Sequence, residues 1–314
     1  MHEFELIQFL KNQNSITSPY VQLGIGDDAA IVNVPDDFQL VSSIDTSIQG
    51  VHFPAETKPY DIAYKSLAVS LSDMAAMGAE PIGILLALTL PEINKHWVEE
   101  FARGFFALVE EFKAPLIGGD TTRGALSIST VVQGLVPQKG ALLRSGAKVG
   151  DLIYVSGYLG DAGLALQEWR AHKLNDPQLQ RALNRPLPRV NLGLALRSLA
   201  TSAIDISDGF AQDLTHILKA SRVGAAIHLE TLPLSEVMLT HRNLKEAQQL
   251  ALQAGDDYEL CFTINPKDQM KITALATKLN LNLTCIGQIT NESELKIYEY
   301  DQLLNFDSSG YQHF

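Results

Sequence analysis

The stretch Ala203-Ile204-Asp205-Ile206-Ser207-Asp208-Gly209 joins an apolar, strand-like run to a segment with helical spacing that continues to Ser221. A strand, a short loop and a helix in this order are typical of α/β folds. The loop carries two aspartates beside serine and glycine. In such folds ligands bind at the carboxyl ends of strands, so the sequence predicts a ligand site at this loop.

The same arrangement, an apolar run that reaches aspartate beside small residues, recurs along the chain. It occurs at Gly26-Asp27-Asp28, Ser72-Asp73, Gly118-Gly119-Asp120 and Gly255-Asp256-Asp257, and Asp45 follows the strand predicted at residues 39–44. Any one of these loops alone is more often a simple turn than a metal site. Together they favour magnesium, a hard cation that takes carboxylate oxygens along with substrate phosphates.

Periodicity divides the chain into two halves. The first, residues 1–137, reads as β-β-α-β-α-β-β behind a short opening helix. One long helix is predicted to be capped by Asp61 and to run to about Met77, and a second runs from Lys95 to Phe112. The segment 137–150 is rich in Gly, Lys and Arg and is typical of an inter-domain connection. Strands and helices then alternate through residues 138–314, among them a helix predicted from Arg189 to Ala200. We therefore expect a two-domain α/β (α+β) protein, divided at residues 1–137 and 138–314.

Composition narrows the possible partners. The chain has 314 residues, with 24 Lys and Arg against 36 Asp and Glu, for a net charge of −12. This charge would repel a nucleic-acid backbone, so no nucleic-acid partner is expected. The acidic N-terminus does not resemble a signal peptide, and the longest apolar run, Ile82 to Leu90, is too short to span a membrane. We expect a cytoplasmic protein without a membrane partner.

Other common signatures of nucleotide enzymes are absent. The sequence contains no G-x-x-x-x-G-K-[ST] and no H-R-D or D-F-G motif, which argues against a P-loop enzyme and against a protein-kinase fold. The stretch Gly24 to Ala29 matches a loosened dinucleotide motif, but a strand-like segment follows it where a helix is needed. Cys261 and Cys285 lie in apolar runs and are predicted to be buried free thiols.

Taken in order, the acidic loops resemble those of the thiamine-phosphate kinases, a family in the superfamily of aminoimidazole ribonucleotide synthetase and selenophosphate synthetase. The resemblance covers essentially the whole chain. The matching stretches are Leu23 to Ala29, Asp45-Thr46, His52-Phe53, Ala68 to Ala79, Ile117 to Thr122, Arg144 to Ala147, Ala203 to Gly209, Gly255 to Leu260 and Gly310 to Phe314.

The resemblance implies both a fold and a reaction. The fold would be synthetase-like, with an N-terminal mixed sheet that pairs into a barrel in a homodimer and a C-terminal α/β domain that completes the active site. The reaction would move the γ-phosphoryl group of ATP to thiamine monophosphate, giving thiamine diphosphate, with several magnesium ions per site.

The resemblance also assigns roles to residues of this chain. The implied magnesium ligands are Asp28, Ser43, Ile44, Asp45, Asp73, Asp120, Asp205 and Asp208. The implied ATP contacts are Gly119, Asp120, Arg144 and Ser207, and the implied thiamine phosphate contacts are His52, Asp256 and Tyr311. Asp120, Arg144 and Asp208 are implied to act in catalysis.

Simpler interpretations of single residues remain open. His52 alone would be a solvated loop histidine, and Arg144 alone would equally be an exposed linker residue. Two positions also depart from the family pattern. Asp256 stands where the family often has glutamate, and Ser308 stands where it often has tryptophan.

Two rival functions are considered. One is another ATP-dependent synthetase of the same superfamily, which would activate a carbonyl oxygen or a selenide. Selenide chemistry favours a reactive cysteine near the N-terminus, and the sequence has none there. The other is a regulatory protein that binds a nucleotide and has lost catalysis. The presence of carboxylates in every acidic loop argues against that interpretation.

Overall fold

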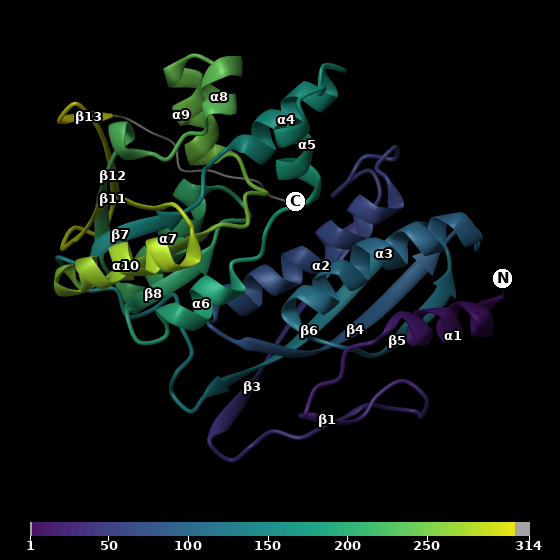
Figure 1. Ribbon diagram of the computed structural model, residues 1–314. Coiled ribbons are helices and arrows are strands. Elements are labelled where there is room, and N and C mark those ends of the chain that lie inside the picture. The colour runs from purple at the N-terminus through teal and green to yellow at the C-terminus, as the bar shows by residue number, and fades with distance from the viewer. Residues whose placement is uncertain (1, 305–314) are drawn as a thin grey trace. The chain divides into compact units, whose positions relative to one another are not determined.

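The computed structural model describes residues 2–304, which fall into two compact units. Unit 1 contains Met1–Met74 and Ala79–Lys139, and unit 2 contains Ala75–Gly78 and Gly140–Phe314 (Figure 1). The change from unit 1 to unit 2 after Lys139 lies within the Gly-, Lys- and Arg-rich segment 137–150.

Unit 1 is built on a mixed four-stranded sheet in the order β3-β6-β4-β5, in which only β4 and β5 run parallel. A separate two-stranded sheet pairs β1 with β2. The elements of this part of the chain are α1 (Glu3–Gln13), β1 (Val21–Leu23), β2 (Ile31–Val32), β3 (Phe38–Ile48), α2 (Pro59–Ala76), β4 (Glu80–Leu90), α3 (Lys95–Phe112), β5 (Leu116–Arg123) and β6 (Ser127–Pro137).

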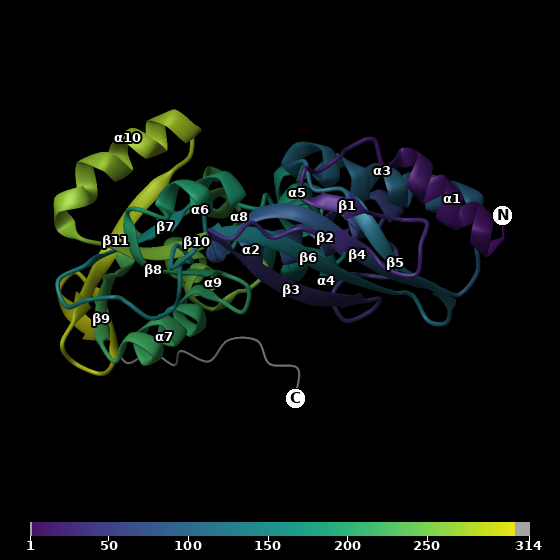
Figure 2. The same ribbon diagram turned by 90° about the horizontal axis from the view of Figure 1, so that it is seen from below.

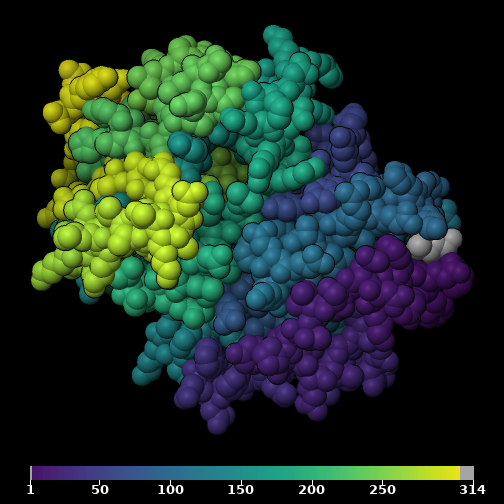
Figure 3. Space-filling view, in the orientation of Figure 1, coloured from purple at the N-terminus to yellow at the C-terminus, as the bar shows by residue number. Residues whose placement is uncertain are grey.

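Helices cover one face of the four-stranded sheet and leave the other open. Figures 1 and 2 show α2 and α3 on the same side of the strands. On that side Ile84, Ile128 and Val132 are fully buried, whereas Ile44 on the other side is 66% exposed. Figure 3 shows α1, in purple, at the surface beside the blue atoms of α3, which it contacts.

Unit 2 is built on a seven-stranded sheet in the order β13-β12-β9-β11-β7-β10-β8. All its pairs are antiparallel except β12 with β9. Its elements are β7 (Leu152–Ser156), α4 (Asp161–Arg170), α5 (Pro177–Asn184), α6 (Val190–Leu196), β8 (Ala200–Asp205), α7 (Phe210–Ser221), β9 (Gly224–His228), η1 (Leu229–Thr231), α8 (Glu236–His241), α9 (Leu244–Gln253), β10 (Leu260–Ile264), η2 (Pro266–Asp268), α10 (Gln269–Leu279), β11 (Leu283–Thr290), β12 (Leu295–Glu299) and β13 (Gln302–Leu304).

Most predicted elements are confirmed, with corrections at their ends. Helix α3 has the predicted bounds, because the side chain of Asn94 accepts a hydrogen bond from the Trp97 amide and so caps its first turn. Asp61 was predicted to cap α2, but that helix begins at Pro59 and Asp61 lies in its first turn. The predicted loop Gly118-Gly119-Asp120 is wrong, because β5 continues to Arg123.

Short elements were not predicted. They are helices α5 and α8 and strands β12 and β13. Helix α5 nevertheless has a clear start signal, because Asp176 accepts hydrogen bonds from the amides of Gln178 and Leu179 and Pro177 follows it. The predicted helix from Arg189 to Ala200 ends earlier, at Leu196, because Ala200 already belongs to β8.

Two further expectations concern the cysteines and the membrane. Both cysteines are free thiols, Cys261 fully buried as predicted and Cys285 only half-buried. In the described part of the chain, no helix is both long and apolar enough to cross a membrane.

Helices α2 and α3 approach each other closely at a glycine. A Cβ atom added at Gly104 of α3 would lie 2.1 Å from the carbonyl oxygen of Tyr60, at the start of α2. No alanine fits at that distance unless one of the two backbones moves. Gly104 therefore sets how near the helices can lie above the sheet.

We predict that Gly104→Ala destabilises the chain. Overpacking typically costs about 1–3 kcal/mol, and each kcal/mol lowers the melting temperature by about 2–4 °C for chains of this size class. Thermal unfolding measures the difference. Glu110→Ala, on the exposed face of the same helix, is the control and should change stability by less than about 0.5 kcal/mol. A Gly104→Ala variant as stable as the wild type would contradict the close approach.

Candidate functional site

Two of the predicted magnesium ligands, Asp45 and Asp73, come together in unit 1. Asp45 lies on β3 and points toward α2, where the Ser70 hydroxyl donates to its Oδ2 at 2.8 Å. Asp73 lies on α2 and accepts a hydrogen bond from the Ser43 hydroxyl of β3. Because side chains alternate along a strand, Ser43 and Asp45 face the helix and Ile44 faces away from it.

This carboxylate pair is electrostatically costly. Burial, and next to it the negative charge of Asp73, raise the pKa of Asp45 to about 6, while the hydrogen bond from Ser70 acts in the opposite direction. Two carboxylates that share a partly buried site favour either a proton or a cation. The Asp45–Asp73 pair therefore gathers hard oxygen donors of the kind that magnesium takes.

Asp120 lies on the other face of the same sheet. In the register of the strands, the row that contains Asp120 also contains Ala87, Ser129 and Thr46, all on the face that the helices leave open. Asp45 belongs to the next row, which ends at Gly119 on β5. The structure of unit 1 therefore separates Asp120 from the Asp45–Asp73 pair by the thickness of the sheet.

Gly119 is required by the backbone. Its φ is +154°, and an added Cβ would lie 1.9 Å from the carbonyl oxygen of Leu86 on β4. Any side chain here would push β5 away from β4. Gly119 thus places Asp120 on the open face of the sheet.

The remaining predicted residues of unit 1 lie in loops. Asp28 is exposed, and its amide donates to Oδ1 of Asp27 at 2.9 Å. His52 is half-buried, and its Nδ1 accepts a hydrogen bond from the amide of Ile48 at 3.1 Å. A neutral imidazole with Nδ1 as acceptor carries its proton on Nε2. In that tautomer Nε2 is the donor atom of the His52 ring.

In unit 2, two of the predicted loops lie side by side. Strands β8 and β10 are antiparallel, and Asp205, the last residue of β8, pairs with Leu260, the first residue of β10. The loop after β8 therefore meets the loop before β10. The amide of Asp256 donates to the carbonyl of Ser207 at 2.9 Å, and the amide of Tyr258 donates to the carbonyl of Ile206 at 2.8 Å.

Asp256 is held in a defined orientation. The hydroxyl of Tyr258 donates to its Oδ1 at 2.9 Å. Both residues have a left-handed backbone, with φ of +69° at Asp256 and +50° at Tyr258. Such conformations are uncommon outside glycine and persist where the surroundings fix them. Here the backbone bonds to the neighbouring loop provide that support.

Asp257, next to it, serves the structure of the loop. It is partly buried, and both of its carboxylate oxygens accept from the amide of Gly160, at 3.0 and 2.9 Å. Burial raises the pKa of Asp257 well above its usual range. Gly160 precedes helix α4, so Asp257 ties the loop that carries Asp256 to the start of that helix.

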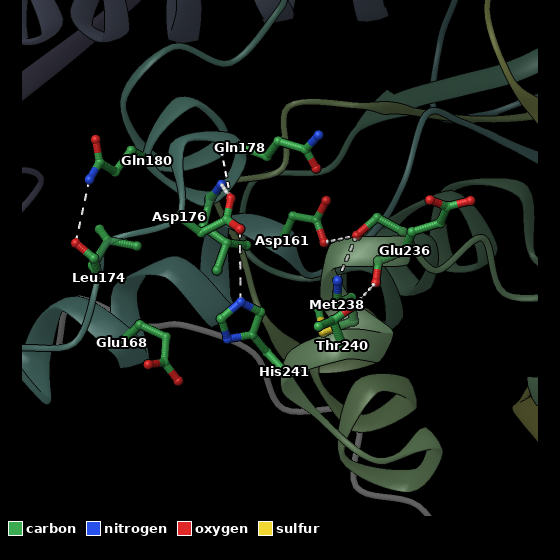
Figure 4. Close-up of polar contacts among 12 residues, drawn as sticks. Asp161, Glu168, Leu174, Asp176, Gln178, Gln180, Glu236, Met238, Thr240 and His241 are labelled. Atoms are coloured by element: carbon green, nitrogen blue, oxygen red, sulfur yellow. Dashed lines mark hydrogen bonds and ion pairs between the residues drawn. The ribbon is translucent and has the colours of Figure 1, made fainter.

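The start of α4 is fixed a second time by the segment before α8. The Ser235 hydroxyl donates to Oδ1 of Asp161 at 2.7 Å and accepts from the amide of Met238 at 3.0 Å. Figure 4 shows Asp161 beside this segment, and His241 facing Asp176 with 3.9 Å between Nε2 and Oδ2. Asp257 and Ser235 therefore both hold the start of α4 by polar contacts.

Sequence patterns did not predict the polar partners that support this loop. Glu259 is buried and forms a bidentate ion pair with Arg189, and it also accepts from the Ser156 hydroxyl at 2.5 Å. The sequence did mark Asp257, because it follows Asp256 directly in the same acidic motif. Arg189 had no such signal, because its partner lies 70 residues further along the chain.

Arg144, through its carbonyl, and Asp208, through its side chain, each accept a hydrogen bond from helix α7. Burial, followed by the positive charges of Arg144 and Lys219, lowers the pKa of His216 on this helix, while the charge of Asp208 acts in the opposite direction. Gln212, one turn earlier, donates to Oδ2 of Asp208 at 3.4 Å. The predicted nucleotide contacts of unit 2 are thus gathered along α7, with Asp205 buried at the end of β8.

The carboxylates do not form one cage inside either unit. Within residues 2–304, no three side chains among histidines, cysteines, aspartates and glutamates are grouped so that they could hold a metal ion. Magnesium commonly uses only one or two carboxylates and completes its shell with phosphates and water. Tyr311, predicted to contact the substrate, and Ser308 lie outside the described residues.

Family models match both parts of the chain. The model described as AIR synthase related protein, N-terminal domain, matches residues 26–136, and the corresponding C-terminal domain model matches residues 148–299. The matched segments together cover more than half of the chain.

Relatives and solved structures agree with these models. The thiamine-monophosphate kinase of Escherichia coli (strain K12) is 45% identical over 319 residues, which cover 99% of this chain and 98% of that protein. The crystal structure of thiamine-monophosphate kinase from Stenotrophomonas maltophilia K279a is 44% identical, with a TM-score of 0.89 over 95% of this chain and 96% of that one.

A solved structure with ligands is also similar. It is described as AaThiL complexed with AMPPCP and TMP, is 29% identical and has a TM-score of 0.78 over 99% of this chain and 97% of that one. The family models, the identity along the full length and the shared fold lead to one conclusion: the chain belongs to the thiamine-monophosphate kinase family, within the group of AIR synthase related proteins.

Proposed function

We propose that this chain phosphorylates thiamine monophosphate with ATP and releases thiamine diphosphate and ADP. The observation that carries the proposal is its identity of 43–45% with thiamine-monophosphate kinases over 99–100% of the chain. The similar fold bound to AMPPCP and TMP supports the same pair of substrates. A cytoplasmic location remains part of the proposal.

The acceptor of this reaction explains the kind of residues present. A phosphate oxygen is already anionic near neutral pH, so it needs no strong general base. The difficulty is repulsion between two polyanions, which positive charge and fixed hydrogen-bond donors must offset. The candidate residues are accordingly carboxylates that recruit cations, one arginine and polar loop groups.

Magnesium fits the residues at the Asp45–Asp73 pair. The available donors are hard oxygen atoms, and burial together with the charge of Asp73 raises the pKa of Asp45. Over all the magnesium ions proposed for the site, the ligands are Asp28, Ser43, Ile44 through its backbone carbonyl, Asp45, Asp73, Asp120, Asp205 and Asp208. When bound, magnesium would neutralise phosphate charge and help align donor and acceptor for in-line transfer.

Residues of unit 2 and the loops of unit 1 bind and orient the substrates in this proposal. Arg144 and Ser207 contact the phosphates of ATP, together with Gly119 and Asp120 from β5.

His52 donates from Nε2 to the phosphate of thiamine monophosphate, as its Nδ1 contact with the Ile48 amide allows. Asp256 and Tyr311 contact the rest of that substrate. Asp120, Arg144 and Asp208 lie closest to the reacting groups.

We further propose a homodimer in which the open sheet faces of two copies of unit 1 pair into a barrel. The open face carries apolar side chains in a central position, with Ile44 in one cross-strand row with Val131 and Leu85. Exposed apolar strands of this kind are poorly tolerated in a monomer. Asp120 lies on the same face, so pairing would bring it close to the partner copy.

The substrate proposal predicts a specific product. Purified chain incubated with ATP, magnesium chloride and thiamine monophosphate should form thiamine diphosphate, measured by chromatography of the fluorescent thiochrome derivatives. Free thiamine should be at least about 100-fold poorer as an acceptor, because it lacks the anionic nucleophile. Product formed with thiamine alone, or hydrolysis of ATP without any diphosphate product, would rule out this activity.

We predict that Asp208→Ala and Asp120→Ala each lower kcat by at least about 100-fold, because each removes a charge close to the transferred group. The melting temperature of both variants should stay close to that of the wild type. Asp37→Ala, which removes an exposed aspartate of unit 1, is the control and should keep full activity. Near-normal turnover in either variant would remove that residue from the proposed site.

The dimer proposal predicts that Ile44→Glu produces monomers, because a charge would be buried without a partner in the paired sheet faces. Light scattering coupled to size-exclusion chromatography gives the mass directly. Met270→Glu, which replaces an 85% exposed apolar residue of α10, should leave a dimer intact. A wild-type chain that is monomeric at micromolar concentrations would contradict the proposed pairing.

A further inference from the structure

Helix α7 carries a polar side chain near each end that binds a loop. Asp213 lies in its first turn and Ser221 is its last residue. The first turn faces the loop Asp205–Gly209, and the last residue faces the loop Arg144–Ala147. These are the two loops of unit 2 to which the proposed function assigns contacts with ATP.

Asp213 holds the first loop. Its Oδ2 accepts from the amide of Ser207 at 3.0 Å and from the amide of Asp208 at 3.1 Å. The side chain is only 3% exposed, so water cannot easily replace these bonds. Without Asp213, two amides of the loop would lose their shared acceptor in a largely buried place.

Ser221 holds the second loop. Its hydroxyl oxygen accepts from the amides of Gly146 and Ala147, both at 3.1 Å, and its proton is donated to the carbonyl of Arg144 at 3.1 Å. One hydroxyl offers one donor and two acceptor sites, so Ser221 uses its full capacity on this loop. A Cβ at Gly146 would lie 2.3 Å from the carbonyl of Thr201, which fixes the loop from its other side.

The helix between these anchors is a firm support. Phe210, Leu214 and Ile217 are fully buried in the core of unit 2, and Leu218 is 4% exposed. Figures 1 and 2 show α7 beside β8, and the two elements are in contact. Movement of either loop relative to the other would therefore require breaking side-chain bonds to a packed helix.

We propose that Ser221 and Asp213 are positioning residues for nucleotide binding, which hold the Arg144 loop and the Ser207-Asp208 loop at a fixed separation along α7. This inference rests on the proposed function, because that function assigns Arg144 and Ser207 to ATP. Pre-arranged loops cost less ordering when the nucleotide binds, so the anchors act on nucleotide affinity. Neither side chain needs to touch ATP itself.

The decisive variant is Ser221→Ala, compared with Ser221→Thr, which keeps a hydroxyl. We expect Ser221→Ala to raise the KM for ATP, and the Kd of a non-hydrolysable ATP analogue, by about 10-fold, which corresponds to about 1.4 kcal/mol. The KM for thiamine monophosphate should change by less than about two-fold, because the Ser221 loop contacts only the nucleotide. Ser221→Thr should restore most of the affinity for the analogue.

The matched control is Thr240→Ala. The Thr240 hydroxyl donates to the carbonyl of Glu236 within helix α8. The substitution therefore removes a similar hydrogen bond that involves neither loop. Amide hydrogen exchange gives a readout that does not depend on activity. Exchange at Gly146 and Ala147 should become at least about 10-fold faster in Ser221→Ala and stay unchanged in Thr240→Ala.

Asp213 provides a second, independent test. Asp213→Ala should weaken binding of the ATP analogue and speed amide exchange at Ser207 and Asp208. Asp213→Asn keeps an acceptor oxygen, so both effects should be smaller in that variant. Should Ser221→Ala not fold, this pair decides the proposal alone. Unchanged affinity for the analogue in Ser221→Ala and Asp213→Ala, or an equal rise in the KM for both substrates, would overturn it.

The two proposals can fail separately. Absence of thiamine diphosphate with the wild-type chain would contradict the proposed function, while the affinity of the ATP analogue would still decide the role of the anchors. A wild-type chain that binds no ATP analogue would overturn both.

Discussion

Side chains alternate between the two faces of a strand, and in unit 1 this alternation organises the candidate site. On β3, Ser43 and Asp45 face helix α2 and meet Asp73, while Ile44 between them faces the open side. On β5 the same rule places Asp120 on the open side, next to the apolar surface proposed to pair in a dimer. One sheet thus presents a carboxylate pair on its covered face and a further carboxylate where a second copy would bind.

In unit 2, the antiparallel pairing of strands brings the candidate loops together. Because β8 and β10 run in opposite directions, the end of one and the start of the other are neighbours, and the loops carrying Ser207, Asp208 and Asp256 are joined by backbone hydrogen bonds. Polar side chains then hold each loop: Asp213, which is buried, and Ser221 from α7, and Asp257 through Gly160. Such supports are expected where reacting groups must be held in place before the substrates arrive.

Much of this fold could be predicted from the sequence, and the errors have physical reasons. Strong periodicity predicted the bounds of α3, which begins at an Asn94 cap in the structure, and the resemblance predicted the family. The pair Gly118-Gly119 looked like a turn, but these glycines allow a close approach of β5 to β4 within the sheet. The sequence also led us to expect ligands at the carboxyl ends of strands in an α/β layer, whereas the loops of unit 2 meet through antiparallel pairing. The anchors Arg189, Asp213 and Ser221 act through contacts that no local pattern reveals.

The central claim is that these carboxylates and loops serve one chemical step, direct transfer of a phosphoryl group between two phosphates. The most direct measurement uses ATP labelled with ³²P at the γ-phosphate, purified chain, magnesium and thiamine monophosphate, followed by separation of the products. The account predicts that the label appears in the terminal phosphate of thiamine diphosphate, in an amount equal to the ADP formed. Label found only in inorganic phosphate, or diphosphate product without label, would contradict it.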